Sequence, residues 1–269
     1  MTTTNYHPPV DKLLTLGDAR TMRKWPDYRT YGLGPEHIPD LIRMVTDEDL
    51  NTVQSDSLQV WAPLHAWRAL GQLRAESAVE PLTSLFHFVD DRHDDWIREE
   101  VPEALGMIGP AAISVVAAYL ANASHGMWAR VAAATSLEEI AKRYPESRSE
   151  CVAILTRQLS QFEENTKTLN TFLIGPLIHL QAIESAPLME RVFAARRVDI
   201  AVYGDWEDVQ IELGLLQERA TPKPDYLADL SRPIQIVEPQ FEPRHTKAKK
   251  RDKRKQQEPR SKKSRKKQG

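Results

Sequence analysis

The chain has 269 residues, of which 41% are hydrophobic and 28% charged, an ordinary balance for a soluble globular protein. It contains no uncharged apolar run of about 18 residues, which disfavours a transmembrane helix. Its first residues lack the basic and apolar segments of a secretory signal. The single cysteine, Cys151, excludes an internal disulfide and suits a reducing compartment, so we expect a cytoplasmic protein without membrane attachment.

The net charge of −2 hides a strong asymmetry along the chain. Residues 244–269 hold 14 Lys and Arg against two acids, whereas residues 1–243 hold 22 Lys and Arg against 36 Asp and Glu. An acidic body therefore carries a basic C-terminal tail. Such a body favours a basic protein partner and would repel nucleic-acid phosphates.

The first 59 residues are predicted to be an irregular N-terminal segment with one capping helix. Prolines and glycines interrupt residues 1–33, so no long helix is expected there. The aromatic side chains of this segment should pack over the first helix pair: Tyr6, Trp25, Tyr28 and Tyr31. A short helix is predicted over residues 35–45, because four aliphatic residues share one face. Residues 47–57 read as a polar connector.

Three tryptophans then mark an internal repeat. Trp61, Trp96 and Trp128 are 35 and 32 residues apart, and each is followed twelve residues later by an aliphatic residue. Each is also followed by a second apolar segment, SAVEPLTSLFHFV, AAISVVAAYLA or ECVAILTRQLSQF. This period, built from paired apolar helices, predicts a stacked helical solenoid. We expect the tryptophans to be buried between units, with an exposed aromatic ladder as the alternative.

A degenerate fourth unit is predicted over residues 165–198. Thr171 stands where the tryptophan would be, and Leu180 and Ile183 are aligned with Leu70 and Leu73. Pro102 and Pro176 should bend their helices.

The segment GDWEDVQIELGLL should close the stack, with Asp205 as the N-cap of a final helix and Val209, Leu213 and Leu216 on its apolar face. The predicted fold is therefore all-α. It comprises an α-solenoid of about four helix pairs over residues 60–220, a proline-rich linker over 221–243 and a disordered tail over 244–269.

The segments DDWIREEVPEALGMIGPAAISVVAAYL and HAWRALGQLRAESAVEPLTSLF resemble HEAT-like repeats of the phycobilisome-lyase type, over roughly residues 60–195. The segment GDWEDVQIELGLL is also similar to the end of an uncharacterised group of bacterial HEAT-like proteins. The resemblance implies a helical repeat fold and says little about activity.

Enzyme families that share this repeat need residues that the chain lacks. Deoxyhypusine hydroxylases hold two irons with His-Glu pairs, but no His-Glu dipeptide occurs here, and Glu99-Glu100 and Leu64-His65 stand at the matching positions. HEAT-like DNA glycosylases need a basic concave face, and this body is acidic. No P-loop, nucleophile elbow or dinucleotide-binding glycine pattern is present. We therefore expect no enzymatic activity and no cofactor, with a phycobilin-lyase-like chaperone as an open alternative.

Several polar residues have both a functional and a structural interpretation. One run offers metal ligands: His87, Asp90, Asp91, His93, Asp94 and Asp95. It lacks the glycine and spacing of a calcium loop, so we predict a solvated turn in which Asp94 or Asp95 caps the next helix, and no metal site. Arg68, Arg98 and Arg130 could bind a partner's carboxylates or the repeats' own acids. His125 is placed in a turn and His179 in the core.

The basic tail contains two clusters without aromatic residues, so any nucleic-acid binding should be non-specific. The candidate contacts are Lys247, Lys249, Lys250, Arg251, Lys253, Arg254, Lys255, Lys262, Lys263, Arg265, Lys266 and Lys267. The tail could equally fold back on the acidic body. The leading hypothesis is a non-catalytic scaffold that presents a curved acidic helical surface to a basic protein. The alternatives are an RNA- or ribosome-associated factor that uses the tail, and the lyase-like chaperone.

Overall fold

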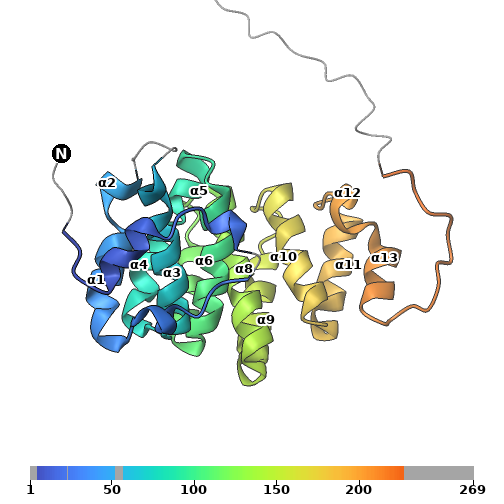
Figure 1. The fold of residues 1–269 in the computed structure, drawn as a ribbon. Helices are drawn as coiled ribbons and strands as arrows, with labels where there is room; N and C mark the ends of the chain where they lie inside the picture. Colours follow the sequence, from blue (N-terminus) through green and yellow to red (C-terminus); the bar gives the residue numbers. More distant parts are fainter. Residues whose placement is uncertain (1–4, 23, 52–56, 227–269) are drawn as a thin grey trace, which may run out of the picture. The chain divides into compact units, whose positions relative to one another are not determined.

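The computed structural model describes residues 5–22, 24–51 and 57–226, and helix is the regular secondary structure throughout these ranges (Figure 1). The prediction of an all-helical fold is thus confirmed, with no strand in the described residues. The predicted basic tail and most of the proline-rich segment lie outside them. No single described helix is long and apolar enough to cross a membrane, and the helical segments Asp95–Ile108 and Pro110–Ala121 meet that test only as a pair bent by 116°.

The N-terminal segment consists of short 3₁₀ turns followed by two α-helices. The turns are η1 (Val10–Thr15), η2 (Ala19–Thr21), η3 (Tyr28–Tyr31) and η4 (Pro35–His37). Helix α1 (Ile38–Val45) occupies the predicted position, because Pro35 and the apolar face of 38–45 favour it. Helix α2 (Glu48–Asn51) lies within the stretch predicted to be a connector, where the Asp47 carboxylate accepts bonds from the first backbone amides of the turn. Residues 52–56 are outside the described ranges.

Helix pairs follow one another along the chain from residue 62 onward. The first helices of the four pairs are, in chain order, α3 (Ala62–Gln72), α6 (Asp95–Ile108), α8 (Met127–Arg143) and α10 (Lys167–His179). In the first pair the second member is divided into α4 (Val79–Ser84) and α5 (His87–Asp91). In the other three pairs it is α7 (Ile113–Ala121), α9 (Arg148–Leu159) and α11 (Ala186–Ala194), in that order. The short helices α12 (Ile200–Tyr203) and α13 (Trp206–Glu212) complete the described part.

These helices pack in two rows. One row runs α1, α3, α6, α8, α10, and the other runs α4, α7, α9, each helix contacting the next in its row. Close approach within the first row depends on the glycine of a repeated Ala-Leu-Gly sequence, residues 69–71 in α3 and 104–106 in α6. A Cβ at Gly71 would stand 2.9 Å from the backbone of Ala104 in α6. The repeated glycine therefore lets consecutive first helices touch backbone to backbone.

The helix ends correct the predicted alignment of the fourth unit. Arg74 and Gln181 both have positive φ, 51° and 53°, and both follow a first helix. In each case the next residue's amide bonds back to the helix, Ala75 to Leu70 (3.1 Å) and Ala182 to Leu177 (2.9 Å). The structure therefore pairs Leu180 with Leu73, whereas the sequence pattern aligns Leu180 with Leu70. The predicted final helix is present, since Asp205 accepts from the Asp208 amide and caps α13.

Candidate functional site

Four aromatic side chains, which we call the aromatic row, belong to successive first helices: three tryptophans at the helix starts and Phe172 in the second turn of α10. Trp61 ends the turn before α3, Trp96 and Trp128 are the second residues of α6 and α8, and Phe172 is in α10. The Trp61 and Trp96 rings meet edge to face with 5.7 Å between centroids, and the Trp128 and Phe172 rings do so at 5.2 Å. In the fourth unit the ring contact is thus made by Phe172, about one turn further into its helix than the tryptophans of the other units.

The tryptophans of this row are not buried, contrary to the sequence prediction. Trp96 is 37% exposed, and Trp61 and Trp128 are half-buried. Residues in the first turn of a helix lie at the end of the packed interface, so large rings there reach the surface. The buried tryptophan is Trp67 in the middle of α3, which is 4% exposed.

Arginine side chains already cover two of the three tryptophan rings of the aromatic row. The Arg20 guanidinium lies 5.0 Å from the centre of Trp61, and that of Arg98 lies 5.7 Å from the centre of Trp128. Both arginines are held by carboxylates, Arg20 by Asp18 at 2.6 Å and Arg98 by Asp95 at 2.9 Å. Among the described residues, no cation covers Trp96.

A cleft of about 470 Å³ opens beside the row. Three tryptophans line it, Trp61, Trp67 and Trp96, and most of its remaining wall is aliphatic. Its charged lining residues are Asp94 and Arg20. The site combines an exposed ring, an apolar hollow and nearby acids, which are features of surfaces that hold a partner's side chains.

The acidic run before α6 serves as helix caps. Asp94 accepts from the Ile97 amide at 3.0 Å, as expected. Asp90 accepts from the amides of Trp128 (3.1 Å) and Ala129 (2.8 Å), and so caps α8 of the next unit. No group of three metal-ligating residues occurs in the ranges that the structure describes.

The repeated arginines bind groups of the protein itself. Arg68 is 3% exposed and donates from Nε to Glu100 at 2.6 Å. Arg130 donates to the carbonyl oxygen of Leu120 at 2.8 Å, and burial lowers its pKa. Arg98 pairs with Asp95, as described above. Arg68 and Arg130 therefore connect neighbouring helices, whereas the Arg98–Asp95 pair lies within α6.

The buried His65 joins the N-terminal segment to α3. Its Nδ1 lies 2.7 Å from the Tyr28 hydroxyl and its Nε2 lies 2.9 Å from the carbonyl oxygen of Gly17. Burial lowers the pKa of His65. Trp25 packs nearby, with the Arg68 guanidinium 5.1 Å from its ring. The aromatic residues of the segment thus cover the first helices, as the sequence suggested.

The remaining candidate residues differ in environment. Cys151 is fully buried, and burial raises its pKa to about 11, which makes the thiol unreactive. His125, in the predicted turn, stacks on Tyr119 with 3.7 Å between ring centres. The core position expected for His179 is wrong, since its side chain is 47% exposed and its Nδ1 lies 2.8 Å from the Glu138 carboxylate.

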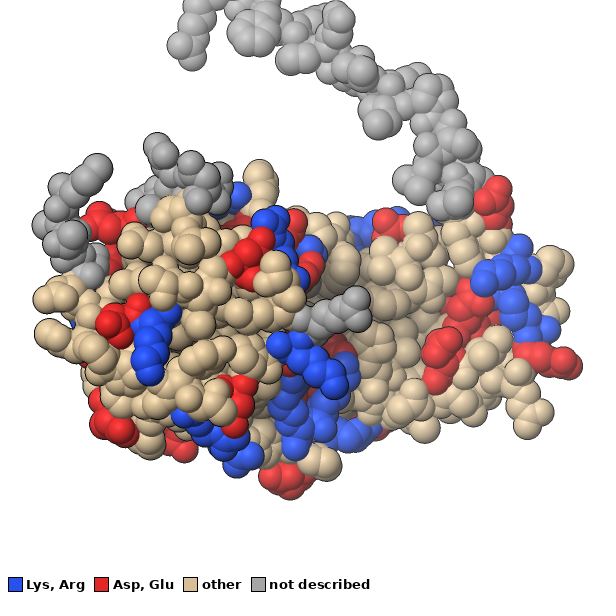
Figure 2. Space-filling view, in the orientation of Figure 1, with Lys and Arg blue, Asp and Glu red and all other residues tan. Residues whose placement is uncertain are grey.

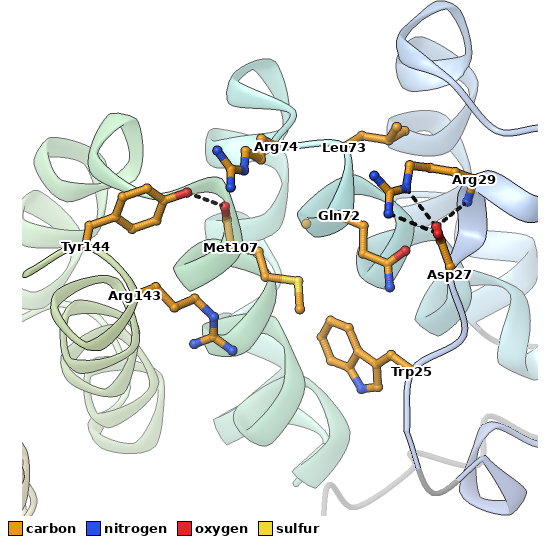
Figure 3. Close-up of a pocket in the computed structure, with 10 residues that line it drawn as sticks. Trp25, Asp27, Arg29, Gln72, Leu73, Arg74, Met107, Arg143 and Tyr144 are labelled. Atoms are coloured by element: carbon orange, nitrogen blue, oxygen red, sulfur yellow. Dashed lines mark hydrogen bonds and ion pairs between the residues drawn. The ribbon is translucent and has the colours of Figure 1, made fainter.

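A second hollow, which we call the arginine cleft, was not predicted from the sequence. It measures about 810 Å³, and its wall is formed by Trp25, Asp27, Arg29, Gly71, Gln72, Leu73, Arg74, Met107, Arg143 and Tyr144 (Figure 3). These residues come from the N-terminal segment and from the ends of α3, α6 and α8. Only the fold brings them together, since Arg29, Arg74 and Arg143 are far apart in the sequence.

Acidic and basic side chains are intermixed over much of the face in Figure 2, and a group of Lys and Arg gathers toward its lower centre. The acidic surplus of the sequence is therefore not spread evenly over this face. The tail residues from Lys247 to Lys267 lie outside the described ranges. No protein-family model, no curated protein and no solved structure matches the chain.

Proposed function

We propose that this protein is a non-catalytic scaffold built as a HEAT-like solenoid, which holds a basic segment of a partner protein at the aromatic row. The single observation that carries the proposal is Trp96. It is the most exposed ring of the row, and it borders a cleft formed with Trp61 and Trp67.

The neighbour relations of the helices support the solenoid. First helices contact first helices, and the second helices α4, α7 and α9 contact one another in chain order. The same glycine position recurs, since a Cβ at Gly106 would collide with Glu139 in α8 much as one at Gly71 would collide with Ala104. A unit repeated in this manner exposes equivalent residues along one edge, which is how such proteins form extended binding surfaces.

The chemistry around Trp96 supports a basic partner. Rings of this row accept guanidinium groups, since Arg20 lies over Trp61 and Arg98 lies over Trp128. Two carboxylates flank Trp96 in the sequence, Asp95 at 76% and Glu99 at 64% side-chain exposure; both pair with Arg98 and remain open to solvent on their other side. A partner's Lys or Arg could cover the free ring and pair with these acids, a combination that favours rapid and selective encounter.

Site-specific photocrosslinking tests this proposal even while the partner is unidentified. A photoreactive benzophenone amino acid would replace Trp96 in the full chain, expressed in the organism that encodes it. The control places the same group at Ile183, which is 49% exposed and lies in the turn before α11. We expect a discrete adduct with a protein from position 96 and none of the same mass from position 183. Adducts that are identical at both positions, or absent from position 96, would refute the proposed docking site.

A second candidate function rests on the charge of the tail. Residues 244–269 carry 14 Lys and Arg against two acids, which suits non-specific contact with RNA phosphates. If about six phosphates were contacted, the slope of log affinity against log salt would be about −5. Retention on RNA should then drop when the chain ends at Pro243. Equal retention of both chains would exclude the tail from this role.

A further inference from the structure

The arginine cleft is walled by segments that the fold holds rigidly against one another. Gln72 at the end of α3 fixes the N-terminal segment, since its amide donates to the Pro26 carbonyl (2.8 Å) and accepts from the Tyr28 amide (2.9 Å). On the opposite side, the Tyr144 hydroxyl donates to the carbonyl oxygen of Met107 at 3.0 Å. Gly109 leaves room for that ring, because any Cβ there would overlap it. The hollow is thus formed before any ligand arrives.

The charged groups of the wall are mostly cationic, with three arginines and only Asp27 as an acid. Arg29 pairs with Asp27 at 2.8 Å, and this arginine remains 67% exposed. Arg143 is oriented by Glu103 at 3.1 Å and by Glu139. Both arginines are therefore positioned by carboxylates yet border open space.

Arg74 differs from the other two arginines because no carboxylate of the described residues forms an ion pair with it. Its guanidinium lies 5.9 Å from the centre of the Tyr144 ring. In Figure 3 the side chains of Arg74 and Arg143 reach toward the space bounded by Tyr144, Met107 and Trp25. Arg74 therefore lacks a countercharge among the described residues, and Arg29 and Arg143 beside it are already oriented. An anion in the cleft would pair with Arg74.

We propose that the arginine cleft binds the phosphoryl group of a small ligand. Guanidinium groups present several N–H donors in a plane that matches phosphate oxygens, and the phosphoryl anion would supply the countercharge that Arg74 lacks among the described residues. The volume of about 810 Å³ exceeds the needs of phosphate alone and lies in the range of small-molecule sites. The apolar surfaces of Trp25, Leu73 and Met107 are available to the remainder of the ligand. This site is separate from the aromatic row.

Isothermal titration of the full chain tests the proposal with inorganic phosphate, adenosine triphosphate, adenosine and phosphotyrosine as probes. We expect the phosphorylated probes to bind and adenosine not to bind. Tighter binding of adenosine triphosphate than of phosphotyrosine would identify a nucleotide-type ligand, and the reverse order a phosphorylated side chain. Either order supports the phosphoryl site, whereas no binding of any phosphorylated probe at millimolar concentration would overturn it.

The variants Arg74→Glu and Arg29→Glu separate this site from other basic residues, above all those of the tail. Both should weaken binding of the preferred probe by at least about tenfold, because each removes a donor and adds a like charge. Arg157→Glu is the matched control, since Arg157 is exposed on α9 and does not line the cleft. Far-ultraviolet dichroism and Tm would show that the variants fold alike. If the two cleft variants bind as tightly as Arg157→Glu, phosphate is held elsewhere and the proposal fails.

Discussion

The carboxylate of Asp90, at the end of α5, occupies the space that a side chain at Gly126 would need, and from there it caps α8. Gly126 precedes the helix but has no side chain with which to cap it. The cap is therefore supplied by the preceding unit, with bonds from the amides of Trp128 and Ala129. This arrangement links two units through a helix terminus as well as through apolar packing.

Removal of this cap should weaken the fold. We expect Asp90→Ala to lower the free energy of unfolding by about 1–2 kcal/mol, since two amides of the first turn lose their acceptor. Asp91→Ala is the control, because Asp91 is the exposed neighbour and caps no helix, and its effect should stay within about 0.5 kcal/mol. Urea denaturation followed by dichroism measures both. Equal effects would show that Asp90 does not hold α8.

Breaking the buried ion pair between Arg68 and Glu100 should destabilise the fold more than breaking the exposed pair between Arg98 and Asp95. Glu100→Gln leaves the Arg68 cation, 3% exposed, without a countercharge, and should cost about 3 kcal/mol. Asp95→Asn breaks the Arg98 pair, but the Asp95 side chain is 76% exposed, so we expect a loss below about 0.5 kcal/mol. Denaturation midpoints of the two variants against the unchanged chain give the comparison. A larger loss for Asp95→Asn would contradict this account of the core.

His65 should make stability depend on pH between neutrality and mild acid. Burial lowers its pKa in the folded chain below the ordinary value of 6.5, so the unfolded chain binds the proton more readily. The contribution is therefore fully present above about pH 6.5 and is lost as pH falls toward the lower folded-state pKa, by up to about 1.4 kcal/mol for each pH unit.

The variant His65→Asn tests this dependence over the range from pH 7 to pH 5. It should be less stable at pH 7, because the contacts with Tyr28 and Gly17 are altered. Its stability should also change less with pH than that of the unchanged chain, as measured by denaturant titration at each pH. Parallel pH profiles for the two chains would assign the dependence to another group.

Two of the three tryptophans that line the cleft beside the aromatic row, Trp67 and Trp96, should differ in their contribution to stability. Trp67 is 4% exposed, and Trp67→Ala should cost about 3–5 kcal/mol because a large buried ring is lost. Trp96 is 37% exposed, and Trp96→Ala should cost at most about 1 kcal/mol. Thermal unfolding of both variants measures the difference. A large loss for Trp96→Ala would place that ring in the core and remove it as a docking residue.

Local signals in the sequence identified most of the elements. Repeated apolar segments indicated the helix pairs, and short polar residues before them indicated the caps Asp94 and Asp205, because capping chemistry is local. The ends of α3 and α10 were harder to place. Each is followed by a left-handed residue that is not glycine, Arg74 or Gln181, so no glycine in the sequence marks the helix end and the repeat pattern misaligns the fourth unit.

The candidate sites were less accessible to sequence reasoning. The sequence shows that tryptophan recurs. Whether a ring in the first turn of a helix is covered depends on how far the adjacent helix extends, and a periodic pattern does not predict that length. The arginine cleft joins Arg29, Arg74 and Arg143, which are far apart in the chain and share no motif. Such a site depends on tertiary packing and becomes visible only with the fold.

The most direct test of the scaffold is the equilibrium dissociation constant for the protein cross-linked through residue 96. It should be measured with the purified full chain and with Trp96→Ala at low and moderate salt. We expect the variant to bind at least about tenfold more weakly, as is usual for loss of an aromatic anchor, and salt to weaken both. Affinities that agree within about twofold would contradict the assignment of the aromatic row as the docking surface.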